Sequence, residues 1–194
     1  MASAQPVDNR IFVLILQHPR EKKEALATAA ITRAVLSRSE LVVGLSWSNL
    51  SQALGRQVDA KRWAVLYLGS ARPARFVLRH EVIALDRRGE ATTDQEAMLK
   101  GIDGVVLLDG SWKEAKTLWW RNPWLLKLRR LVLNPQHPSQ YGRFRREPRR
   151  EAVSTLEAAA LVLKHLDGGP EIEAALLGAL DRLLAESPSA SSLR

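Results

Sequence analysis

The sequence predicts an α/β fold in which a mostly parallel sheet is flanked by helices. Short apolar runs of strand length recur along the 194 residues, and helical spacing of apolar residues separates most of them. Continuous apolar runs are typical of parallel strands, which are buried on both faces. No internal repeat or linker divides the chain. We therefore expect one domain at residues 11–185, between a flexible N-terminal arm (1–10) and a disordered tail (186–194).

The expected strands follow from runs rich in β-branched and other apolar residues. Pro19 ends the first run, and Asp109 with Gly110 ends the run that precedes them. The remaining runs are bounded by polar residues or glycine. We expect strands at residues 11–16, 41–45, 64–68, 105–108 and 131–133, of which 11–16 and 105–108 are central, and an edge strand at residues 82–85.

Helices are expected between these strands. Ser111 with Glu114, and Ser154 with Glu157, have the spacing of a capping box, which marks the start of a helix. Asn122 and Pro123 end the first of these two helices. Residues 46–62 are mixed in character and basic towards their end, and we assign no element to them. The expected helices are residues 24–37, 93–99, 112–120 and 155–166, followed by a last one that carries Ile172, Leu176, Leu180 and Leu183 at helical spacing.

Composition narrows the classes of function. Lys and Arg total 29 against 21 Asp and Glu, a net charge of +8, which favours a polyanionic partner such as nucleic acid over a merely solvated basic surface. The absence of cysteine excludes disulfides, thiolate metal sites and a cysteine nucleophile. No apolar run has the length of a membrane span and no apolar signal segment begins the chain, so a cytoplasmic location is the expectation. The histidines lack metal-ligand spacing, so no metal is expected; they are His18, His80, His137 and His165.

Three loops that follow apolar strands predict a site. Residues 17–23, 69–73 and 109–112 come directly after strands, and in a parallel sheet such loops gather at one edge, where ligands bind. They contribute His18, Arg20, Gly69, Asp109, Gly110 and Ser111. The alternative is that Asp109 and Ser111 only shape a turn. The chain has no G-x-G-x-x-G and no P-loop, which argues against a dinucleotide or nucleoside triphosphate, and no G-x-S-x-G elbow of a serine hydrolase.

A basic segment predicts RNA binding. Residues 134–150 interleave arginines with Tyr141 and Phe144, and arginines pair with phosphates while aromatic rings stack on unpaired bases. The alternative is a solvated arginine-rich loop. The expected RNA-binding residues are Arg20, Lys22, Lys23, Tyr141, Arg143, Arg145, Arg146 and Arg149, with Arg129 and Arg130 as further cationic candidates. Of the tryptophans, Trp112 can form a wall of the pocket, whereas Trp119 and Trp120 are expected to pack against the core or an interface.

Four ordered motifs resemble the DTW-domain family. Asp109-Gly110-Ser111-Trp112 is similar to the family's Asp-x-Thr-Trp signature. It is followed by an arginine-bearing segment at 141–145 and a Ser-Thr-x-Glu-Ala helix start at 154–158, and it is preceded by a similar strand-exit motif at 16–21. The resemblance covers about residues 11–166. It implies that the expected domain is a single catalytic domain. Ser111 replaces the signature threonine but keeps its hydroxyl. The chain also lacks the cysteine-rich segment of many relatives, which puts the RNA substrate in question more than the chemistry.

The resemblance implies a tRNA-uridine aminocarboxypropyltransferase. Such an enzyme moves the 3-amino-3-carboxypropyl group of S-adenosylmethionine to N3 of a uridine and releases methylthioadenosine, without a metal. It also implies a SPOUT-like fold with a C-terminal knot. The expected partner is tRNA, or rRNA, with no membrane, and the expected state is a monomer or homodimer. The competing hypotheses are a SPOUT-type RNA methyltransferase and a non-catalytic RNA-binding protein.

Roles for individual residues follow from the same resemblance. Asp109 is the expected catalytic residue, which accepts or orients the uridine N3 proton. The donor's carboxylate is expected at the helix starts or at Arg143 or Arg145. Glu157 is expected to pair with the donor's ammonium, or else to serve only as a capping residue. The expected cofactor-binding residues are Leu68, Gly69, Asp109, Gly110, Ser111, Trp112, Leu133, Arg143, Ser154, Thr155 and Glu157.

Overall fold

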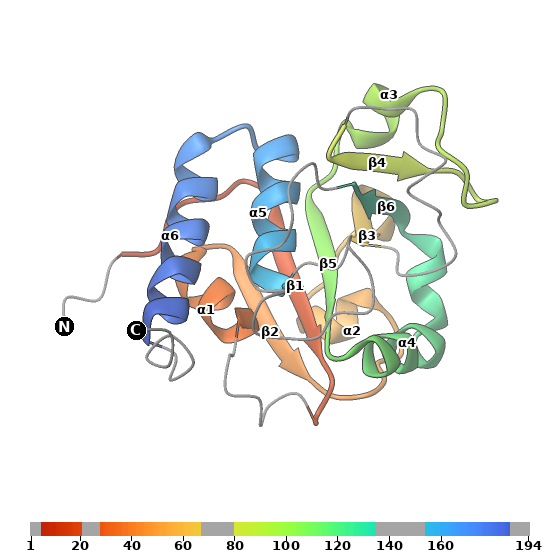
Figure 1. The fold of residues 1–194 in the computed structure, drawn as a ribbon. Helices are drawn as coiled ribbons and strands as arrows, with labels where there is room; N and C mark the ends of the chain where they lie inside the picture. Colours follow the sequence, from red (N-terminus) through yellow and green to blue (C-terminus); the bar gives the residue numbers. More distant parts are fainter. Residues whose placement is uncertain (1–4, 21–27, 67–79, 135–153, 187–194) are drawn as a thin grey trace.

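A six-stranded mixed sheet forms the centre of the molecule (Figure 1). The structure is a computed structural model that describes residues 5–20, 28–66, 80–134 and 154–186. The strand order is β2-β1-β5-β3-β6-β4, and every neighbouring pair is parallel except β4 with β6. The strands are β1 (Phe12–Gln17), β2 (Ser39–Val43), β3 (Trp63–Leu66), β4 (Val82–Leu85), β5 (Gly104–Asp109) and β6 (Arg129–Leu133).

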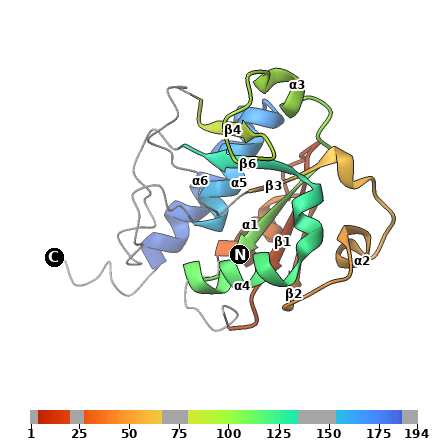
Figure 2. The same ribbon diagram turned by 90° about the vertical axis from the view of Figure 1, so that its right-hand side faces the viewer.

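Helices cover both faces of the sheet, as Figure 2 shows. One face packs against α1 (Thr28–Val35), α5 (Thr155–Leu166) and α6 (Pro170–Glu186). The other packs against α2 (Leu50–Leu54), α4 (Trp112–Arg121) and the 3-10 helix η4 (Pro123–Lys127). The short η2 (Ala60–Arg62) leads into β3, and α3 (Gln95–Leu99) lies beside β4.

Alternate residues of each central strand supply the two cores. In β1, Val13 and Ile15 pack on the α1, α5 and α6 side, whereas Leu14 and Leu16 pack on the α2 and α4 side. All four are fully buried. A strand with both faces buried reads as an unbroken apolar run, which is why the sequence identified β1 and β5.

The predicted elements are found, with shifts that tertiary contacts explain. β2 ends at Val43 rather than at residue 45, and Gly44 then packs against Trp47, where an added Cβ would lie 2.8 Å from a ring carbon. Residues 46–62, which the sequence left unassigned, contain α2 and η2. Residues 24–27 of the first expected helix and residues 67–68 of the expected β3 lie outside the described residues.

The second half of the predicted N-terminal arm is attached to the domain. Val7 forms an isolated bridge with Leu36. Asn9 is 1% exposed, and its amide donates to Ile11 O at 2.8 Å and Arg38 O at 2.9 Å. Arg10 pairs with Asp167 beyond α5. Residues 7–10 therefore contact the domain, and the flexibility of the arm stays a prediction; residues 1–4 and 187–194 lie outside the described residues.

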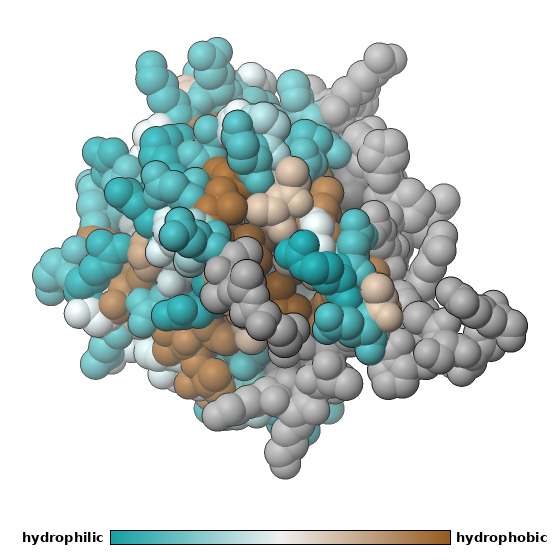
Figure 3. Space-filling view, turned by 90° about the vertical axis from the view of Figure 1, so that its left-hand side faces the viewer, coloured by the Kyte–Doolittle hydropathy of each residue, from teal (hydrophilic) through white to brown (hydrophobic). Residues whose placement is uncertain are grey.

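The side of the molecule that bears α6 exposes mainly hydrophilic residues, with smaller hydrophobic groups between them (Figure 3). Among the helices in the described ranges, none combines the length and the apolarity needed to cross a bilayer.

Candidate functional site at the carboxyl end of β5

The end of β5 meets the starts of two helices. Asp109 is the last residue of β5, and it lies beside Gln17, the last residue of β1, in the parallel register. α4 begins three residues after Asp109, and α5 begins at Thr155. The carboxyl ends of parallel strands are the usual ligand-binding edge of such a sheet.

Asp109 is buried and held by two side chains. Asp109 is only 6% exposed. The amide of Gln17 donates to Oδ2 at 2.8 Å, and the hydroxyl of Thr155 donates to Oδ1. A buried carboxylate requires such donors, since water no longer solvates it. The two oxygens of a carboxylate offer about four lone-pair directions, so these two donors orient the group and leave acceptor capacity for a ligand.

Gly110 makes the turn from β5 into α4. Its φ is +154°, and a Cβ built on it would lie 2.9 Å from Glu114 Cβ. A side chain at this position therefore meets both backbone strain and a steric clash. The glycine lets the chain reverse direction directly after Asp109, so that the carboxylate and the start of α4 lie close together.

Both helices begin with a complete capping box. At α4, Ser111 Oγ accepts from Glu114 N at 3.4 Å, and Glu114 Oε2 accepts from Ser111 N at 2.9 Å. At α5, Ser154 Oγ accepts from Glu157 N at 3.1 Å, and Glu157 Oε2 accepts from Ser154 N at 2.9 Å. The first box is half-buried and the second is buried. Each helix start carries a partial positive charge that suits an anionic group.

His18 lies next to this turn. Its backbone amide donates to Asp109 O at 3.0 Å, and its Nδ1 accepts from Arg20 N at 3.3 Å. Nδ1 is also 3.8 Å from Glu114 Oε1, which is too far for a hydrogen bond.

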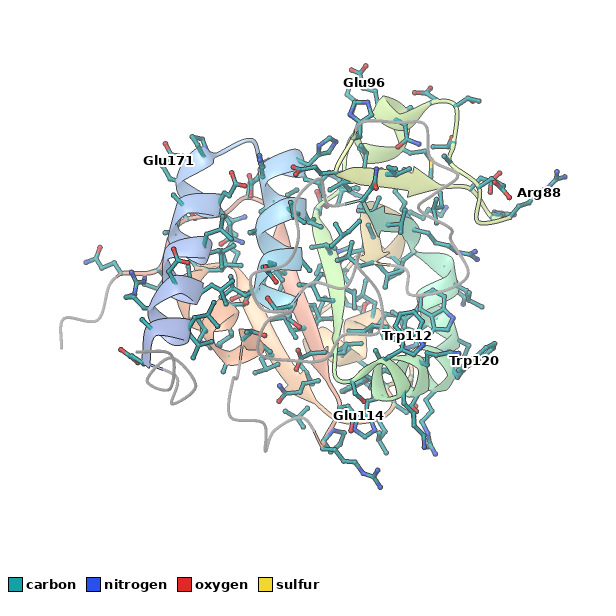
Figure 4. The ribbon with its side chains drawn as sticks, viewed as in Figure 1. Arg88, Glu96, Trp112, Glu114, Trp120 and Glu171 are labelled. Atoms are coloured by element: carbon teal, nitrogen blue, oxygen red, sulfur yellow. The ribbon has the colours of Figure 1, made fainter. Side chains whose placement is uncertain are left out.

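The three tryptophans of α4 differ in exposure. Trp112, in the first turn, is half-buried, and Trp119 is half-buried against the core. Trp120 is 76% exposed and projects from α4 (Figure 4). Trp120 does not pack against the core of its own chain, because α4 turns only Ala115 and Leu118 fully inward, and its packing at an interface stays a prediction.

The structure brings together most of the expected cofactor-binding residues. Asp109 and Thr155 are in direct contact, and they join the α4 start to the α5 start. Glu157 serves as the acid of a capping box, and its pairing with a ligand ammonium stays a prediction. Leu133 ends β6 and is half-buried against the core. The members of this expected set that form the two helix starts are Gly110, Ser111, Trp112, Ser154, Thr155 and Glu157, whereas Leu68, Gly69 and Arg143 lie outside the described residues.

Arg20 is the expected RNA-binding residue that the described ranges contain, and it is exposed just beyond β1. The further cationic candidates have structural roles: Arg129 Nη1 donates to Met98 O at 3.0 Å and Lys100 O at 2.6 Å, and Arg130 Nη1 donates to Arg87 O at 3.4 Å. The other expected residues lie outside the described part: Lys22, Lys23, Tyr141, Arg143, Arg145, Arg146 and Arg149.

Gln17 is a residue of the candidate site that the sequence did not single out. It is 5% exposed and orients Asp109. The signal was a polar residue that directly follows the apolar run of β1, within the motif at 16–21. Over the described residues, no three side chains of His, Cys, Asp or Glu gather in a way that would hold a metal ion.

Comparison with known proteins identifies relatives. The family model described as "DTW domain" matches residues 1–187. A protein named tRNA-uridine aminocarboxypropyltransferase 2 from Drosophila melanogaster is 31% identical over 175 residues, which cover 88% of this chain and 62% of the relative. Proteins of the same name from Macaca fascicularis and Mus musculus are 25% and 26% identical, covering 93% and 92% of this chain. The chain spans 56% and 55% of those two relatives. No solved structure matches significantly.

Proposed function

The chain belongs to the DTW-domain family, and we propose that it transfers the 3-amino-3-carboxypropyl group of S-adenosylmethionine to N3 of a uridine in tRNA. The names of the relatives support this activity and this substrate. The observation that carries the proposal is the buried, doubly hydrogen-bonded carboxylate of Asp109 between two helix starts.

The residues at the site fit such a donor. In S-adenosylmethionine, the carbon to be transferred is bonded to a sulfonium sulfur. When that bond breaks, the sulfur leaves as part of neutral methylthioadenosine. The donor's carboxylate suits the partial positive charge at the starts of α4 and α5, or Arg143 or Arg145. Glu157 is the candidate partner for its ammonium, in addition to its capping role. The half-buried ring of Trp112 offers a wall, and Leu68, Gly69 and Leu133 are candidates to hold the adenosine.

Asp109 takes the N3 proton of the uridine in this proposal. As the proton passes to a carboxylate oxygen, N3 gains the electron pair that forms the new N3–C bond, and the C–S bond electrons go to sulfur. Gln17 and Thr155 keep the carboxylate in one orientation while the proton moves. A carboxylate is a weak base for an imide N–H, so we expect proton transfer to accompany bond formation rather than to precede it.

We also propose that the fold is SPOUT-like and knotted at its C-terminal end. The support is the mostly parallel order of the sheet and the return of α5 across β5 after β6. The connection between β6 and α5, residues 135–153, decides the knot and lies outside the described residues. An experimental structure that traces this connection tests the proposal.

Mass spectrometry of nucleosides tests the proposed reaction. Unmodified tRNA incubated with the protein and S-adenosylmethionine is expected to yield aminocarboxypropyl-uridine, together with methylthioadenosine. A methylated nucleoside with S-adenosylhomocysteine would instead indicate a SPOUT-type methyltransferase. RNA binding with no binding of S-adenosylmethionine would indicate a non-catalytic RNA-binding protein.

A further inference from the structure

The outer face of α4 combines an exposed aromatic ring with cations. Trp120 is 76% exposed, a large share for an indole. Lys116 and Lys113 lie four and seven residues before it, so the three side chains share one face of the helix. Both lysines are exposed. We call Lys113, Lys116 and Trp120 the α4 face.

The surroundings of the α4 face are also basic. Arg121 ends α4 and Lys127 ends η4, and both are exposed. The acid of α4 is Glu114, whose carboxylate accepts from Ser111 N inside the capping box. The lysines of the face therefore meet no opposing carboxylate from their own helix, which suits a polyanion.

Asn122 fixes the end of α4 that carries Trp120. Asn122 is fully buried, and its amide donates to Leu118 O at 2.8 Å and to Leu45 O at 3.0 Å. Its Oδ1 accepts from Trp47 N at 2.9 Å and Trp124 Nε1 at 3.2 Å. The helix end is thus anchored to the loop after β2. A platform fixed in advance loses little conformational freedom when it binds a partner.

The α4 face begins at the candidate site. The start of α4 is joined to Asp109 through Gly110 and Ser111. Trp120 lies eight residues beyond Trp112, which places it about 12 Å farther along the helix axis at 1.5 Å per residue. This separation corresponds to the length of a few nucleotides of RNA. A nucleotide close to a target base bound at Asp109 can therefore reach Trp120.

We propose that the α4 face is an RNA-docking surface, on which Trp120 stacks against an unpaired base near the target uridine while Lys113 and Lys116 bind flanking phosphates. This inference rests on the proposed function for the identity of the RNA. Aromatic stacking combined with cationic side chains is the chemistry that binds unpaired nucleotides.

Charge favours RNA over a second copy of this chain. A two-fold interface places the same patch on both subunits, so Lys113, Lys116 and Arg121 would face identical cations. Lysine is also depleted in protein interfaces, whereas a phosphate backbone attracts it.

Equilibrium binding of unmodified tRNA to the full chain, without S-adenosylmethionine, tests the proposal. We expect Trp120→Ala to weaken tRNA binding roughly tenfold, as for loss of one base–aromatic stack. Trp120→Phe, which keeps a ring, should retain most of the affinity, and Trp120→Leu, which keeps only apolar bulk, should not. Arg88→Ala is the matched cationic control, because Arg88 is exposed and lies well away from α4 (Figure 4).

The salt dependence of binding tests the two lysines. Lys113→Gln with Lys116→Gln should reduce the slope of log affinity against log salt by about 1.4, since each phosphate contact to single-stranded nucleic acid contributes about 0.7. Arg88→Ala should leave the slope as it is. Circular dichroism of each variant checks that α4 remains folded.

The outcomes separate this surface from the reaction. Unchanged tRNA affinity in Trp120→Ala overturns the proposal, and so does a shift from dimer to monomer at constant tRNA affinity, which would make the face a protein interface. Weakened binding by the variants, with no aminocarboxypropyl-uridine from the wild type, would support the surface and contradict the proposed reaction. A wild type that binds no tRNA would contradict both.

Discussion

The starts of α4 and α5 carry the same local motif in different surroundings. Each is a Ser-x-x-Glu capping box with both of its hydrogen bonds formed. At α5, Ser154 and Glu157 are only 5% and 7% exposed. At α4, Ser111 and Glu114 are half-buried. The same sequence signal thus gives a buried helix start in one place and a partly exposed helix start in the other.

The contacts of Asp109 explain what the difference does. Thr155, directly after the buried cap, donates to its carboxylate, so α5 supports the acid from inside. Gly110 makes the tight turn from Asp109 into the half-buried start of α4. We therefore assign rigidity to the α5 start and access to the α4 start, and each of the following variants tests that division.

Gly110→Ala should have the largest effect on stability. The added Cβ would lie 2.9 Å from Glu114 Cβ at a φ of +154°, and strain with overpacking together cost about 3 kcal/mol. Gly168→Ala is the control, because Gly168 has a φ of +74° but nothing within 4 Å of the built Cβ. Urea unfolding should show the larger loss for Gly110→Ala; equal losses would mean that the turn is not sterically restricted.

Removing the capping serine should destabilise the protein more at the start of α5 than at the start of α4. Ser154→Ala is expected to lower the free energy of unfolding by about 2 kcal/mol and Ser111→Ala by about 1 kcal/mol, because only the α5 cap leaves a buried amide unsatisfied. Urea denaturation of both variants checks this order. A larger loss in the free energy of unfolding for Ser111→Ala would mean that the start of α4, and not that of α5, is the rigid one.

The sequence was sufficient for most of the sheet and for the place of Asp109 at the end of β5. β1 and β5 were predicted because burial on both faces leaves an apolar run that needs no tertiary information. Asp109 was predicted because a strand, a glycine and a cap follow one another there. Both capping boxes were predicted from spacing alone and are confirmed.

What the sequence did not predict depends on contacts between distant segments. The end of β2 depends on the packing of Gly44 on Trp47, and the loop that follows is held by Asn122, 75 residues away from Trp47. Gln17 was not identified as a site residue because its partner is 92 residues away. The burial that distinguishes the two capping boxes is likewise a property of the packed helices and not of their motifs.

Loss of either donor to Asp109 should reduce turnover more than binding. Thr155→Val and Gln17→Leu are each expected to lower kcat about tenfold, which corresponds to an activation free energy higher by about 1.4 kcal/mol. The reason is that the Asp109 carboxylate is no longer held in a single orientation. Thr155→Ser keeps the hydroxyl and should restore most of kcat. Steady-state kinetics with tRNA and S-adenosylmethionine check the split; a rise in KM alone would place these residues in ground-state binding.

The far end of α5 should show a smaller, pH-dependent effect. Burial, and then the neighbouring His80, lower the pKa of His165 below its ordinary value. The unfolded chain then binds more protons than the folded chain in acid, so this contribution to stability is complete above pH 6.5 and falls as the pH drops below it. His165→Asn should flatten the melting temperature between about pH 7 and pH 5. An unchanged slope would assign the pH dependence to other groups.

The most direct test of the account is turnover by Asp109→Asn, measured as aminocarboxypropyl-uridine formed in tRNA, alongside binding of S-adenosylmethionine. Asparagine keeps the size of the side chain but removes the proton acceptor. We predict a loss in turnover of about 100-fold or more, typical of a missing general base, while the donor remains bound. Full turnover by Asp109→Asn would contradict the role of Asp109 as the acceptor of the uridine proton.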